Sequence, residues 1–272
     1  MRQIILFFLS ILALVLWGCE ENSPLVPESQ QVVVRAYIYA NEPVDDIQLT
    51  TTYSITSEDT VGAPLNDATI SLVKNGQTYA LVPSAGDSGY YHYPGDDLQV
   101  DVGDEFEIVV EHNGETITGK TMVPSPPVDV AISKDVYTID TSAFGFRGDT
   151  SSVTVSWNQE DEDTFYFIVV ENIEAELVYI DERFGDMLRG IRRFRSHPIK
   201  DDEYQIQRFD LTFQGMHDVR VYKVNQEYAD LYEFGLQDSR NLNEPKSNIQ
   251  NGLGVFAGFS SATVQFTVSV TE

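Results

Sequence analysis

One stretch sets the fold class of this chain: Thr69-Ile70-Ser71-Leu72-Val73-Lys74-Asn75-Gly76-Gln77-Thr78-Tyr79-Ala80-Leu81-Val82. Two runs rich in β-branched and aliphatic residues flank its central Asn-Gly pair. Asn-Gly favours the positive φ angles of a two-residue turn, so the stretch predicts an antiparallel hairpin. The chain is therefore expected to be built from strands.

The same pattern continues on both sides of this hairpin. His112-Asn113-Gly114-Glu115 places a second Asn-Gly turn between the runs Phe106–Glu111 and Thr116–Met122. Two earlier runs, Val32–Tyr39 and Ile47–Ile55, are also rich in β-branched and aromatic residues. Together these runs predict a sandwich of about seven antiparallel strands over residues 31–123.

A proline-rich segment follows this first module. Val123-Pro124-Ser125-Pro126-Pro127 interrupts strand pairing, because proline has no amide hydrogen to donate. We therefore place a boundary here and expect a second β-rich module over residues 128–272.

The second module contains a strand ending in tryptophan, Val153-Thr154-Val155-Ser156-Trp157, and a partner strand, Thr164–Val170. The pair is similar to an immunoglobulin or fibronectin type III module with Trp157 in its core. Four carboxylates, Glu160–Asp163, lie between the two strands. They could bind calcium through their oxygens, and the plainer alternative is a solvated hairpin tip.

One short helix is expected near residues 225–238. Asn225 is a suitable N-cap, and Tyr228, Leu231, Tyr232 and Leu236 recur at helical spacing. The chain ends with the runs Val255–Phe259 and Thr263–Val270, the second alternating as a core strand does. The expected fold is mainly all-β, with two β-sandwich modules and one helix packed on the second.

The first 18 residues have the layout of a signal peptide. The apolar run Ile4–Trp17 has 14 residues, fewer than the roughly 20 that span a membrane. Leu16-Trp17-Gly18-Cys19 resembles the lipobox of bacterial lipoproteins, which predicts cleavage between Gly18 and Cys19 and lipidation of Cys19. An ordinary secreted protein is the alternative. Residues 19–30 are polar and contain prolines, as in a flexible tether.

The composition excludes several classes of function. The chain has 17 Lys and Arg against 43 Asp and Glu, a net charge of −26, which argues against binding nucleic acid or anionic headgroups. Its 15 Phe and 14 Tyr are enough for a packed core. Cys19 is the only cysteine, so a lipidated chain has no disulfide, thiol nucleophile or cysteine metal site.

No motif of an enzyme stands out. The four histidines lack zinc-binding spacing, and no Gly-x-Ser-x-Gly elbow or dinucleotide-binding loop is present. Carboxylates are too abundant to single out the pair that glycoside hydrolysis needs. We therefore expect no enzymatic activity, no cofactor and no metal.

One group of candidate binding residues comes from the segment 183–200, which holds six of the 17 basic residues. Guanidinium groups at Arg189, Arg192, Arg193 and Arg195 could hold an acidic ligand or partner. The alternative is charge balancing against an acidic surface.

A second group comes from Gly89-Tyr90-Tyr91-His92-Tyr93. Alternate strand residues share a face, so Tyr91 and Tyr93 would lie together and could stack on a sugar or a peptide. At least one face of this strand is expected to be ordinary core.

The segment from Asn243 to Phe256 resembles a signature of the Bacteroidetes lipoproteins that carry domain of unknown function 4249. The shared features are a proline, Ser-Asn-Ile, and Gly-Leu-Gly with an aliphatic residue before Phe, here from Pro245 to Phe256. Gly252 and Gly254 would permit a tight backbone with positive φ, so a structural role for the signature is expected.

The resemblance implies a two-part β-rich lipoprotein of the outer membrane, facing the cell surface or the periplasm. It also implies an association with a TonB-dependent importer, because members are often encoded beside one. It carries over no catalytic or ligand-binding residue. The leading hypothesis is a non-enzymatic cell-envelope lipoprotein that binds a small-molecule or glycan ligand as an importer accessory. An adhesin or envelope-structural protein is the alternative, and a glycan-active hydrolase ranks third.

Overall fold

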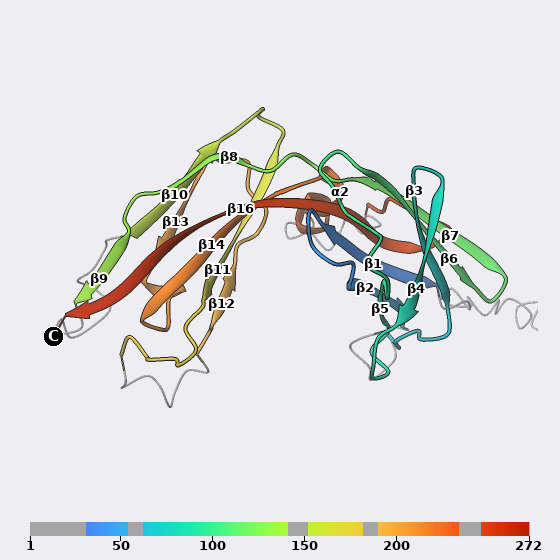
Figure 1. Cartoon of the computed structure of the whole chain (residues 1–272), viewed down its shortest axis with the longest axis horizontal. Coiled ribbons are helices and arrows are strands. Elements are labelled where there is room, and N and C mark those ends of the chain that lie inside the picture. Colours follow the sequence, from blue (N-terminus) through green and yellow to red (C-terminus); the bar gives the residue numbers. More distant parts are fainter. Residues whose placement is uncertain (1–30, 54–61, 141–151, 182–189, 234–245, 272) are drawn as a thin grey trace, which may run out of the picture.

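A single strand, β16 (Leu253–Thr271), runs through both lobes of the molecule (Figure 1). The computed structural model describes residues 31–53, 62–140, 152–181, 190–233 and 246–271. The expectations for Gly18, Cys19, the tether and Arg189 lie outside these residues. Within them the chain is mainly β, with two modules and one α-helix, and the predicted fold class is confirmed.

The first module is a curved sheet that folds over its own core. Its strand order is β16-β1-β2-β5-β4-β3-β6-β7-β15. Both predicted hairpin turns are confirmed, because Asn75, Gly76, Asn113 and Gly114 have φ angles of 52°, 79°, 51° and 81°. The strands are β1 (Val32–Tyr39), β2 (Asp46–Thr51), β3 (Thr69–Lys74), β4 (Gln77–Pro83), β5 (Tyr90–His92), β6 (Glu105–His112), β7 (Glu115–Met122) and β15 (Ile249–Gln250).

The second module is a sandwich of two sheets. One sheet has the order β12-β11-β14-β16, with β9 paired in parallel to the end of β16, and the other has the order β13-β10-β8. Trp157 is buried between them with its ring 5.2 Å from that of Tyr166, as predicted. The strands are β8 (Val128–Ile132), β9 (Val136–Asp140), β10 (Ser152–Asn158), β11 (Phe165–Asn172), β12 (Arg193–Arg195), β13 (Glu203–Gln207) and β14 (Gly215–Val224).

The C-terminal strand differs from its sequence prediction. The runs Val255–Phe259 and Thr263–Val270, expected as separate strands, are parts of β16. Val33 to Tyr39 pair in parallel with Leu253 to Phe259, and β14 then pairs antiparallel with the rest of β16 up to Val268. The C-terminal segment that we assigned to the second module thus also completes the sheet of the first.

Both faces of β16 are covered where the modules meet. Phe256 packs into the core of the first module, whereas Val255 and Phe259 pack into a separate junction cluster. The junction cluster joins side chains of β11, β14, β16 and the helix α2 (Gln226–Glu233). Its fully covered aromatic rings bury large areas of apolar surface and so contribute strongly to holding the modules together.

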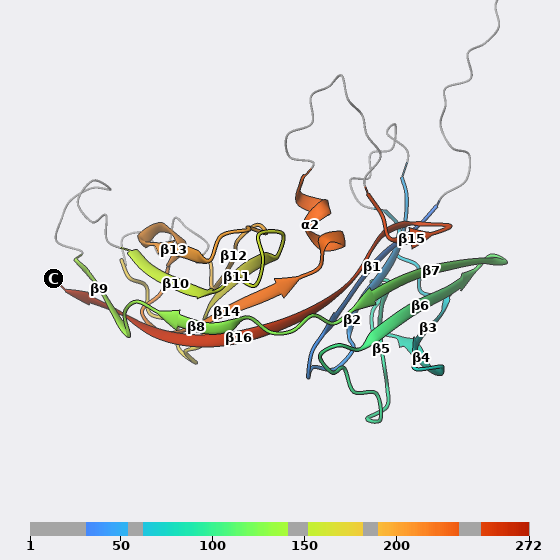
Figure 2. The ribbon, with the colours of Figure 1, turned by 90° about the horizontal axis from the view of Figure 1, so that it is seen from above.

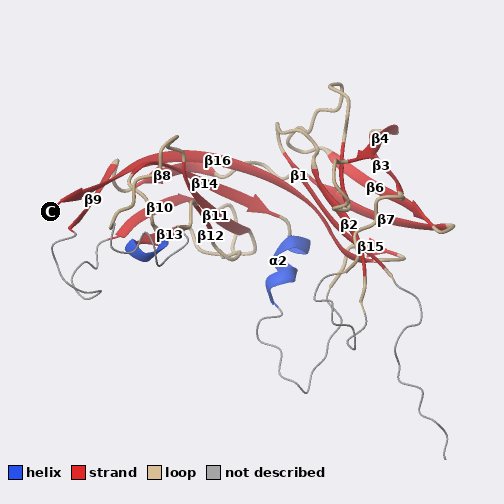
Figure 3. Cartoon of the chain, turned by 90° about the horizontal axis from the view of Figure 1, so that it is seen from below, coloured by secondary structure: helices blue, strands red, loops and turns tan. Residues whose placement is uncertain are grey.

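The helix α2 lies in the angle between the modules (Figures 2 and 3). Its Tyr228 is buried with ring centres 4.9 Å from Phe259 and 5.6 Å from Tyr37. The side-chain amide of Asn225, the expected N-cap, instead donates to the Met122 carbonyl at 2.8 Å, across to the first module. Within the described ranges, no helix is long and apolar enough to cross a membrane.

In the segment Ser247–Gly254, the side chain of Asn248 fixes the local backbone by hydrogen bonds. The Asn248 amide donates to the carbonyls of Lys120 and Phe256 at 2.9 and 2.7 Å, and its oxygen accepts from the Phe256 N–H at 2.9 Å. Positive φ falls at Gly254 (111°) and Asn251 (59°) rather than at Gly252. These contacts support the expected structural role of the signature.

Gly254→Ala should destabilise the protein strongly. A Cβ atom there would lie 1.9 Å from the Val34 carbonyl oxygen, and the φ of +111° is unfavourable for alanine. We expect a loss of more than about 2 kcal/mol in the free energy of unfolding, measured by urea denaturation. Gly76→Ala is the matched control, because Gly76 has a φ of +79° and open space around it. Equal losses in the two variants would contradict the close-contact explanation.

Candidate functional site

A pocket of about 410 Å³ lies at the junction of the two modules. One wall comes from the end of β1 and the connection to β2, and the other from β11, β12 and β14. The lining residues are Tyr39, Glu42, Asp45, Asp46, Phe167, Val169, Glu171, Arg193, Arg195, Asp218, Arg220 and Tyr222. Its volume falls within the range of small-molecule sites, roughly 300–1,000 Å³.

Strand alternation brings these side chains to one face. On β11, Phe167, Val169 and Glu171 line the pocket, while the intervening Ile168 and Val170 fill the sandwich core. On β14, Asp218, Arg220 and Tyr222 line it in the same way. Because β11 is apolar on both faces, its sequence reads as one continuous hydrophobic run.

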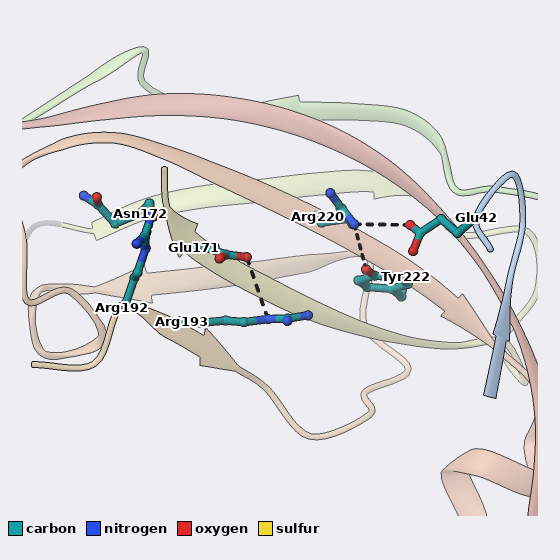
Figure 4. A network of polar contacts seen from close by, with 7 residues as sticks. All are labelled: Glu42, Glu171, Asn172, Arg192, Arg193, Arg220 and Tyr222. Atoms are coloured by element: carbon teal, nitrogen blue, oxygen red, sulfur yellow. Dashed lines mark hydrogen bonds and ion pairs between the residues drawn. The ribbon is translucent and has the colours of Figure 1, made fainter. Parts of the chain in front are cut away.

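Two of the four predicted arginines reach the pocket. Arg193 and Arg195 are two residues apart on β12 and line it together, whereas Phe194 between them packs against the sandwich core. Arg192 points elsewhere, because its Nε donates to the Asn172 carbonyl at 2.9 Å (Figure 4). Arg189 lies outside the described residues.

Ion pairs engage most of the charges in the pocket. Arg220 contacts Glu42 at 3.3 Å across the two modules, and Arg193 contacts Glu171 at 3.9 Å (Figure 4). Both pairs are substantially exposed, so each contributes at most about 1 kcal/mol. The Arg220–Glu42 pair joins residues of the two walls but adds little to holding the modules together.

Two groups in the pocket, Tyr39 and Arg220, have pKa values raised further above neutral pH. Burial raises the pKa of Tyr39, and the nearby Asp46 carboxylate raises it further. The hydrogen bond between Arg220 and the Tyr222 hydroxyl raises the pKa of Arg220. Neither shift suits general acid–base catalysis near pH 7.

One member of the predicted tyrosine pair is buried. Tyr91 has no exposed surface, and its hydroxyl donates to the Leu65 carbonyl at 3.0 Å and accepts from the Ala68 N–H at 3.2 Å. It is a core residue, so the expectation that it contacts a ligand is wrong. Tyr93 is half-buried against Tyr79, and its hydroxyl donates to Asp97, which raises the pKa of Tyr93 to about 12.

The acidic turn at Glu160–Asp163 is engaged by lysines. Lys223 contacts Glu160 at 2.5 Å, and this hydrogen bond lowers the pKa of Glu160. Lys200 contacts Asp163 at 2.9 Å. Nowhere in the described ranges do three or more His, Cys, Asp or Glu side chains gather in a way that could hold a metal ion.

Comparison with known proteins shows the family. A family model for a domain of unknown function, DUF4249, matches residues 20–265. The chain belongs to the DUF4249 family. The curated proteins contain no match to it.

Solved structures similar to this DUF4249 chain include the FN1–FN3 domains of chicken CNTN1, with a TM-score of 0.27 and 11% identity over 89% of this chain and 68% of that one. A titin structure has a TM-score of 0.20 and 12% identity over 72% of this chain and 61% of that one. A Ca²⁺-stabilised adhesin of an ice-binding Antarctic bacterium has a TM-score of 0.23 and 17% identity over 90% of this chain and 50% of that one.

On β14, on the strand face opposite the pocket residue Asp218, the DUF4249 chain buries His217 in one tautomer. His217 Nδ1 lies 3.0 Å from the Gly215 carbonyl oxygen, and its Nε2 lies 3.4 Å from the Asn172 amide nitrogen. Nδ1–H therefore donates and Nε2 accepts, which is the neutral form. Burial disfavours the charged imidazolium and so lowers the pKa of His217. Protonation would also place a second N–H against the amide nitrogen of Asn172.

The stability of the protein should fall as the pH drops below about 6.5, the pKa of an unfolded histidine. Because the pKa of His217 is lower in the folded state, the unfolded state takes up the proton first as the pH falls. The stability that neutral His217 contributes is therefore fully present above about pH 6.5 and is lost progressively below it. We expect the melting temperature to fall between pH 7.5 and 5.5, and less so in His217→Gln. An equal fall in both proteins would contradict the assignment.

Proposed function

We propose that this DUF4249 protein is a non-enzymatic, lipid-anchored protein of the outer membrane, facing the cell surface or the periplasm. It binds a small ligand in the junction pocket and serves a TonB-dependent importer. The observation that carries the proposal is the pocket itself, which neither module could form alone. A site between two modules, with aromatic and charged groups on its walls, is a common setting for ligand binding.

The contents of the pocket favour binding over catalysis. Four of its charged side chains are paired with one another, as Arg220 with Glu42 and Arg193 with Glu171. Phe167 and Tyr222 stack at 4.6 Å and provide an apolar face between these charges. Such a surface can orient a ligand. Its hydroxyl–carboxylate pair, Tyr39 with Asp46 at 3.2 Å, is poorly suited to covalent catalysis, because burial raises the pKa of Tyr39 whereas an activated nucleophile needs a lowered one.

The predicted tether joins the first module at the end of β1 that lies away from the pocket. The predicted tether, residues 19–30, leads into β1 at Val32, and Tyr39 at the other end of β1 lines the pocket. Eight residues of strand span about 26 Å, so β1 holds the pocket that far from the anchored end. This distance would let the pocket face a partner that projects from the membrane.

Crosslinking of intact cells should recover a TonB-dependent importer with the affinity-tagged protein. Cys19→Ala is the matched control, and it should lose palmitate labelling, leave the membrane fraction and recover at least tenfold less importer. Mass spectrometry of the crosslinked material provides the measurement. Recovery of no importer with the lipidated protein, or equal recovery with the unlipidated variant, would count against this proposal.

A further inference from the structure

The charge pairing in the junction pocket leaves two opposite charges without a partner. Arg195 is the only pocket cation in the described part of the chain with no carboxylate at ion-pair distance, since Arg193 and Arg220 each have one. The chain has 43 acidic residues against 17 basic ones, so an arginine without an acidic partner is a candidate to bind an acidic ligand.

The unpaired carboxylate belongs to Asp45. Glu42 and Glu171 pair with arginines, Asp46 lies 3.7 Å from Arg35, and Asp218 accepts from Gln265. Asp45 is thus the only pocket carboxylate in the described ranges with neither a hydrogen bond nor an ion pair. It comes from the connection between β1 and β2, whereas Arg195 comes from β12 in the other module.

The setting of Arg195 prepares it to receive a carboxylate. Its guanidinium lies over the ring of Phe167 at 4.3 Å and within 5.2 Å of the centre of the Tyr228 ring. Stacking on a ring fixes the guanidinium plane but leaves its N–H groups, which lie in that plane, free to bind a carboxylate with two hydrogen bonds. The exposed head of Arg195 is therefore held in place without being neutralised.

We infer that the pocket binds a small zwitterionic ligand, a short peptide with free termini. Its carboxylate would lie at Arg195, its ammonium group at Asp45, and its apolar part against Phe167 and Tyr222. The inference rests on the proposed function, since it names the ligand class of the same pocket. A sugar acid would satisfy Arg195 alone and would leave the second charge unmatched.

The spacing of the strands sets the length of the peptide. β12 and β14 are separated by one strand, so their charged side chains lie about 10 Å apart. Arg195 and Arg220 both lie opposite Val169 of β11, and Glu42, three residues before Asp45, contacts Arg220 at 3.3 Å. An extended peptide advances about 3.4 Å per residue, so a chain of about three residues fits.

The test is retention of three pools of random tripeptides by the purified, immobilised mature protein, read by mass spectrometry. One pool has free termini, one is N-acetylated and one is C-amidated. Retention of the free pool should exceed that of each capped pool at least tenfold. Equal retention of a capped pool overturns the inference, as does retention of none. An importer that still copurifies would leave the proposed function standing in either case.

Substitutions at Arg195 and Asp45 test which residue binds each end of the peptide. Arg195→Gln and Asp45→Asn should each reduce retention of the free pool at least tenfold, and Arg195→Lys should reduce it less than Arg195→Gln. Lys134→Gln is the matched control, because Lys134 also lies over an aromatic ring, that of Tyr137 at 5.4 Å, outside the pocket. Melting temperatures confirm that each variant is folded. Wild-type retention by folded Arg195→Gln, or displacement of the peptides by glucuronate, would overturn the inference.

Discussion

The backbone hydrogen bonds of β16 are the constraint on which the rest of the structure depends. One strand cannot pair with β1 at one end and β14 at the other unless both modules are in place. Its fully covered segment then supports the junction cluster, in which Phe259 contacts rings from both modules and from α2. The relative position of the modules is therefore fixed by strand pairing and packing together.

The pocket follows from this arrangement. Tyr39 and Glu42 come from the first module, and Phe167 and Arg220 come from the second. The exposed ion pairs in the pocket, such as Arg220 with Glu42, are individually weak, so ion pairing alone could not fix the relative position of the two modules. The shared strand supplies the rigidity, so Arg195 and Asp45 need not pair with each other to hold the modules together and can serve a ligand. Preorganisation of this kind reduces the entropy lost when a ligand binds.

Local sequence was enough to predict the parts of the fold that local physics decides. The Asn75-Gly76 turn, the buried Trp157 and the helix around Tyr228 each depend on a few neighbouring residues. The continuity of β16 could not be predicted in this way, because Ser260-Ser261-Ala262 reads as a break between two apolar runs. Only pairing with β14, more than 30 residues away, makes that segment a strand.

The candidate site shows the same division. A local reversal of charge pointed to Arg193 and Arg195, which line the pocket, but it could not separate them from Arg192, which bonds to backbone carbonyls. Strand alternation places Tyr91 and Tyr93 on one face but does not say which face is buried, so it could not predict that Tyr91 lies in the core. Asp45 could not be found at all, since one carboxylate among 43 acidic residues carries no signal until the fold shows that it has no partner.

The most direct test of the central claim is whether the modules unfold together. In the chain from residue 20 onward, Trp157 in the second module is the only tryptophan, so its fluorescence reports on that module alone. Leu72→Ala removes a fully buried side chain from the first module and should cost about 2–5 kcal/mol. A shared strand predicts that the urea midpoint from Trp157 fluorescence falls by the same amount as the midpoint from circular dichroism. An unchanged Trp157 midpoint, with a separate earlier transition in the dichroism, would contradict it.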